Sequence, residues 1–185
     1  TNACFWLSLA AGLSASSWSP HCVNGQALPA VVATLLAQTR AMDLRVLDKP
    51  ADKSIKDTPL GMLAATLRQH FCAGPSPVLL RPDMMGRIYQ AFAGLGKDAG
   101  DRTLGMYKKW VDRLATKEFA DELVVVAVAI ELKIRAVCVP FTPPKATRPW
   151  VITTYQDSDA VVPDGRNVYL GNNDVHYMWL SRATA

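Results

Sequence analysis

The stretch that decides the fold opens the chain: Thr1-Asn2-Ala3-Cys4-Phe5-Trp6, which leads into a strongly apolar run as far as Leu13. Asn2 is a favourable helix N-cap, and the apolar run predicts a helix buried in the middle of a domain. Cys4 then falls in the first turn, where unpaired N–H groups and the helix dipole favour a thiolate. The same N–H groups, on Ala3 and Cys4, can hold an oxyanion. We therefore expect Cys4 to be a nucleophile; the alternative is a small apolar residue in a core helix.

A partner for this cysteine lies near the other end of the chain. In residues 167–180, two apolar runs flank the turn-forming stretch 171–174, which predicts a β-hairpin with strands at 168–170 and 175–180. His176 begins the second strand. A cysteine at a helix start and a distant histidine on a strand are the pair that a thiol hydrolase needs. The alternative is that His176 is an ordinary, half-buried strand residue.

Three sequence blocks carry a resemblance to a known family. They are Asn-Ala-Cys-Phe-Trp at 2–6, Phe-Ala-Asp-Glu-Leu-Val-Val-Val-Ala-Val-Ala at 119–129, and the stretch 168–180 that contains His-Tyr-Met-Trp-Leu. In this order they resemble the Cys, helix–strand and His motifs of ovarian-tumour-domain (OTU) cysteine proteases. The resemblance implies a papain-like deubiquitinase fold, with Cys4 as nucleophile, His176 as general base, and ubiquitin or a ubiquitin-like modifier as partner. A virus or a pathogen effector is the expected source.

The chain departs from the family at two places. Family members commonly carry Asp or Asn two residues after the histidine, where this chain has Met178, and a thioether cannot brace an imidazole. Candidates for a third catalytic residue are therefore Asn2, Asn172, Asn173 and Asp174. The family's Asp-Gly-Asn-Cys pattern is also replaced, by Thr-Asn-Ala-Cys, so Asn2 is a candidate for orienting the site or shaping the oxyanion loop.

Three aromatic residues are candidates for substrate binding: Trp150, Tyr155 and Tyr177. The first two are expected to line a narrow channel for a Gly-Gly tail. Tyr177 directly follows the proposed base.

Bulk properties limit the other function classes. The 185 residues are 50% hydrophobic and 19% charged, which fits one globular domain over 1–185. The net charge of +4 forms no basic stripe, so we expect no nucleic-acid partner. The longest apolar run, 123–130, is too short to cross a bilayer, so we expect no membrane partner. The four cysteines, at 4, 22, 72 and 138, lack metal-site spacing, which predicts reduced thiols, no metal or cofactor, and a cytoplasmic setting.

Helical spacing and turn residues predict the remaining elements. Helices are expected at about 28–42, 58–71, 82–95, 103–115 and 119–132, and strands at 135–141 and 151–155. Together with the hairpin they predict an α+β fold, in which a small central β-sheet is sandwiched by helices. Residues from about 43 to 118 are a candidate helical insert or ubiquitin-facing arm.

Two further functions compete with the deubiquitinase. One is a viral polyprotein-processing papain-like cysteine protease with the same catalytic pair. The other is a catalytically inactive ubiquitin-binding module, which Met178 favours.

Overall fold

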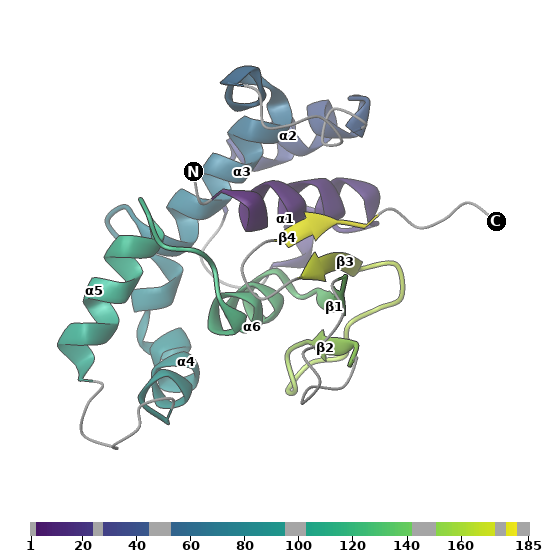
Figure 1. The fold of residues 1–185 in the computed structure, drawn as a ribbon. Coiled ribbons are helices and arrows are strands. Elements are labelled where there is room, and N and C mark those ends of the chain that lie inside the picture. The colour runs from purple at the N-terminus through teal and green to yellow at the C-terminus, as the bar shows by residue number, and fades with distance from the viewer. Residues whose placement is uncertain are drawn as a thin grey trace.

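The computed structural model describes residues 3–23, 28–44, 53–94, 103–141, 151–172 and 177–180, and it combines helices with one small sheet (Figure 1). The predicted mixture of helices and strands is confirmed. The helices are α1 (Cys4–Ala15), α2 (Val31–Arg40), α3 (Pro59–Cys72), α4 (Pro82–Gly94), α5 (Leu104–Leu114) and α6 (Glu122–Leu132). Short 3-10 helices are η1 (Pro20–Cys22), η3 (Lys53–Asp57) and η4 (Val78–Leu80). The strands are β1 (Arg135–Pro140), β2 (Thr153–Tyr155), β3 (Asn167–Asn172) and β4 (Tyr177–Trp179).

The sheet has the strand order β2-β1-β3-β4. Its central pair, β1 and β3, is parallel, and both outer strands are antiparallel to their neighbours. The predicted hairpin is confirmed, because Leu170 of β3 lies opposite Trp179 of β4, and Asn172 lies opposite Tyr177. The carboxyl ends of β1 and β3 therefore meet at the edge of the sheet where β4 begins.

Two helices cover one face of this sheet. Tyr155, Ala136 and Val168 lie side by side on neighbouring strands, so their side chains share a face. On that face α1 approaches closely, because a Cβ added at Gly12 would lie 2.4 Å from Val168 Cγ1. The N-terminus of α6 meets the same face, where the Tyr155 hydroxyl donates to Glu122 Oε1 at 2.9 Å.

The opposite face of the sheet is open in the part of the chain that the structure describes. Val137 and Val139 are half-buried there, and Tyr169 and Met178 are 36% and 44% exposed. The expectation of a sheet sandwiched by helices is therefore wrong for the described residues. The layer order is one sheet, then α1 and α6, then the remaining helices (Figure 1).

Helix α1 is the centre of the core, as its sequence predicts. Nine of its twelve residues are buried, which follows from apolar side chains all round the helix. On the side away from the sheet, the ring of Trp6 lies 5.8 Å from that of Phe71 in α3. Beyond the end of α1, Trp18 Nε1 donates to the Leu132 carbonyl at the end of α6, at 2.7 Å. Helices α1 and α6 are thus joined at their C-terminal ends.

The candidate insert, about residues 43–118, holds α3, α4 and α5. Helix α3 is part of the central core through its contact with Trp6. Between α4 and α5, Phe92, Tyr107 and Trp110 pack together with ring centroids 5.3 to 5.5 Å apart. The Tyr107 hydroxyl donates to the Leu79 carbonyl at 2.6 Å. These three aromatic residues therefore serve as core, whereas Met106 of α5 is 47% exposed.

Candidate functional site

Cys4 is the first residue of α1, as predicted, and its side chain is half-buried. The N-cap is Ala3, whose side chain makes no capping hydrogen bond. This corrects the prediction that Asn2 is the cap; Asn2 lies outside the described residues. The Ala3 carbonyl accepts from Leu7 N at 2.9 Å, so the helix proper starts at Cys4. Its first-turn N–H groups have no intrahelical acceptor, which suits a thiolate or an oxyanion.

The thiol of Cys4 differs from the other described cysteines in its accessibility. Cys4, Cys72 and Cys138 are free, but the latter two are buried. Burial raises the pKa of the Cys72 thiol to about 12 and that of the Cys138 thiol to about 11. Both thiols are therefore protonated and unreactive at neutral pH. Of these three cysteines, only Cys4 can serve as a nucleophile.

The start of β4 lies beside the start of α1. The rings of Phe5 and Tyr177 meet edge to face, with centroids 5.0 Å apart and an interplanar angle of 75°. Burial, followed by repulsion from the nearby acidic groups of Cys138, Asp121, Tyr155 and Cys4, raises the pKa of Tyr177, so its phenol stays neutral. Tyr177 is only 8% exposed. It was expected to bind substrate; the structure places it in the core, where it joins β4 to α1.

Four other predicted site residues, His176, Asp174, Asn2 and Trp150, lie outside the described residues, as does Asn173. Asn172, another candidate for the third catalytic residue, is described. It ends β3 and is half-buried, and it shares the helix-covered face with Tyr177, its partner across the hairpin. Met178 points to the open face instead.

A pair of acidic residues at the start of α6 borders the same region. Asp121 caps the helix by accepting from Leu123 N and Val124 N. Burial raises its pKa, and these backbone donors oppose the rise. Glu122 accepts the hydroxyl hydrogen bond of Tyr155, 33 residues away in sequence. No local sequence pattern points to the contact between Glu122 and Tyr155.

Tyr155 itself is half-buried, and burial, followed by the hydrogen bond to Glu122, raises the pKa of its phenol. Its role in a substrate channel stays a prediction.

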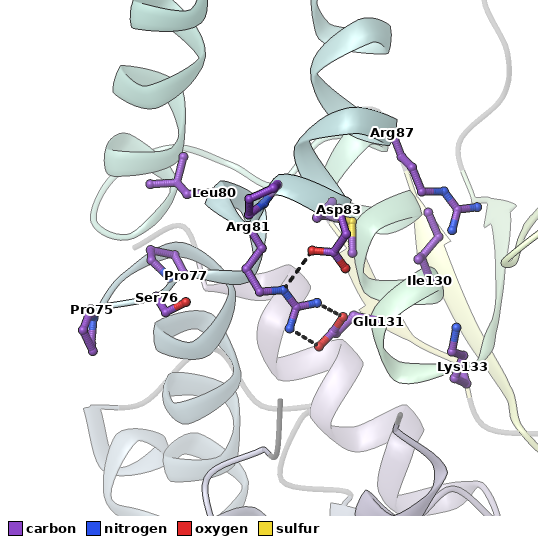
Figure 2. Close-up of a pocket in the computed structure, with 12 residues that line it drawn as sticks. Pro75, Ser76, Pro77, Leu80, Arg81, Asp83, Arg87, Ile130, Glu131 and Lys133 are labelled. Atoms are coloured by element: carbon purple, nitrogen blue, oxygen red, sulfur yellow. Dashed lines mark hydrogen bonds and ion pairs between the residues drawn. The ribbon is translucent and has the colours of Figure 1, made fainter. Parts of the chain in front are cut away.

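A cavity of about 580 Å³ lies elsewhere, between the start of α4 and the end of α6 (Figure 2). Its floor is the buried pair of Arg81 and Glu131, joined by two hydrogen bonds, with Asp83 3.5 Å from Arg81 Nε. Since Glu131 and Glu122 lie near opposite ends of α6, about 14 Å apart along the helix, the cavity is separate from the Cys4 region.

The other cations on the wall of this cavity are also paired. Arg87 Nη2 lies 2.9 Å from Asp157 Oδ1, and Lys133 Nζ lies 2.8 Å from Asp157 Oδ2. Burial alone would raise the pKa of Asp157, but the hydrogen bonds from these two cations outweigh it and hold the pKa well below its usual range. This network ties the loop after β2 to α4 and α6, and each charged side chain among the described residues that line the cavity has a partner of opposite charge.

His70, at the end of α3, belongs to this second region. Its Nε2 is 4.0 Å from Glu131 Oε1, and burial lowers its pKa although the carboxylate opposes the shift. His70 therefore packs against the buried Arg81–Glu131 pair.

Neither a metal site nor a membrane segment is found in the described ranges. No group of three or more His, Cys, Asp or Glu side chains there is arranged to hold a metal ion. No described helix has both the length and the apolar character that crossing a membrane requires.

Compared with models of known protein families and with curated proteins, the chain gives no match. Membership of the OTU family therefore stays a prediction from the three sequence blocks.

Proposed function

We propose that the chain is a thiol-dependent deubiquitinase of the OTU type. It hydrolyses peptide or isopeptide bonds at the C-terminus of ubiquitin or a ubiquitin-like modifier. The observation that carries the proposal is the position of Cys4: a half-buried cysteine that is the first residue of a buried helix, directly after the N-cap Ala3. The free N–H groups at a helix start favour the thiolate, and they also favour the oxyanion that forms when the thiolate attacks a carbonyl carbon.

The position of β4 supports His176 as the base. Tyr177 follows His176 in sequence and packs on Phe5, which follows Cys4. The described neighbours of the two proposed catalytic residues are therefore in contact, although 172 positions separate them in the chain. Of the four candidates for the third residue, Asn172 lies on the α1 side of the hairpin, and Asn2, Asn173 and Asp174 lie outside the described residues.

The proposed reaction is acyl transfer in two stages. His176 accepts the proton of the Cys4 thiol, and the thiolate adds to the carbonyl carbon of the terminal glycine. The oxyanion is bound by the backbone N–H groups of Ala3 and Cys4, each worth about 3 kcal/mol in comparable sites. The C–N bond then breaks, and the amine leaves with the proton from His176. In the second stage His176 takes a proton from water, whose oxygen displaces the thiolate and releases the carboxylate.

The setting proposed for this activity is the cytosol of a host cell. Cys4, Cys72 and Cys138 are free thiols in the structure, which fits a reducing compartment. The candidate arm, about residues 43–118, would contribute the surface of α4 and α5 to ubiquitin binding.

An inactive ubiquitin-binding module is the second candidate. Met178 favours it, because the position that carries a bracing Asp or Asn in the family holds a thioether on the open face of β4.

A ubiquitin probe with an electrophile at its C-terminus tests the proposal. A covalent adduct supports the deubiquitinase, and noncovalent binding alone supports the inactive module. Cleavage of flanking sequence without an adduct would indicate a polyprotein-processing protease. Cys4→Ala and His176→Ala should each abolish the adduct while the melting temperature stays close to that of the parent. His21→Ala is the matched control, since His21 is exposed on η1, and it should label normally.

A further inference from the structure

We draw no further inference here: the strongest candidate, the open face of the sheet around Val137, Tyr169 and Met178, carries no proposal because nothing in the described part of the structure shows what covers it.

Discussion

Replacing Gly12 by alanine tests whether α1 packs against the sheet as closely as the structure shows. The added Cβ would lie 2.4 Å from Val168 Cγ1, whereas carbon atoms in contact are normally about 3.5 Å apart or more. Val168 is fully buried and its β-branched side chain has little rotamer freedom, so α1 has to move by roughly 1 Å. Overpacking of this kind costs about 1–3 kcal/mol. The gain in helix propensity from Gly to Ala offsets about 1 kcal/mol of that.

Gly86→Ala is the matched control for this change. Gly86 is exposed in α4, and a Cβ added there meets nothing within 4 Å. This variant should gain about 1 kcal/mol from helix propensity alone. In urea denaturation, Gly12→Ala should therefore be less stable than Gly86→Ala by about 1–3 kcal/mol, or several degrees in melting temperature. Val168→Ala should relieve the clash, so Gly12→Ala should cost less free energy of unfolding in that background.

The same variant links the fold to the proposed chemistry. A shift of about 1 Å in α1 moves Cys4 relative to β4, and misplacement of that size can lower a rate by roughly 100-fold. Gly12→Ala should therefore slow probe labelling, whereas Gly86→Ala is a control for stability alone, because α4 belongs to the candidate ubiquitin-facing arm. If Gly12→Ala stabilised the protein as much as Gly86→Ala does, the close contact between α1 and β3 would be refuted.

Three further changes test the rest of the structure. Because the pKa of Asp157 is depressed in the folded state, its contribution to stability is present above its unfolded pKa of about 3.9 and is lost as the pH falls below it. Asp157→Asn should therefore lower the urea midpoint at pH 7, and the gap from the parent should narrow at pH 3; an unchanged gap would contradict the shift. Glu131→Gln leaves Arg81 buried beside a neutral amide and should cost about 3–5 kcal/mol in unfolding free energy, whereas replacing both residues by apolar ones should restore most of it. Iodoacetamide at pH 8 should modify Cys4 in the native protein but should modify Cys72 only after unfolding, as peptide mass mapping would show. Rapid modification of Cys72 in the native protein would contradict its burial in the core.

Most elements could be predicted because local signals determine them. Thr58 before Pro59 predicts a helix start, and Thr58 Oγ1 does accept from Gly61 N at 3.2 Å. The valine run 124–126 favours a strand by propensity, yet it forms the middle of α6. The cap at Asp121 and burial of apolar residues around the helix outweigh that preference.

The arrangement of the site could be predicted only in part. The hairpin pattern predicts that the side chains of Tyr177 and Met178 point to opposite faces of the sheet, but it does not show which of these faces α1 covers. Only the tertiary contact between Phe5 and Tyr177 decides this. The open face of the sheet could not be predicted for the same reason. The alternation of side chains along a strand does not show whether helices cover one face of the sheet or both. The contact between Glu122 and Tyr155 likewise depends on how β2 pairs with β1.

The most direct test of the central claim is to identify the residue to which the ubiquitin probe becomes attached. After labelling and proteolysis, tandem mass spectrometry should find the ubiquitin remnant on the peptide that contains Cys4, bonded to its Sγ. Attachment to another residue, or equal labelling of Cys4→Ala, would contradict the claim that the thiol at the start of α1 is the nucleophile.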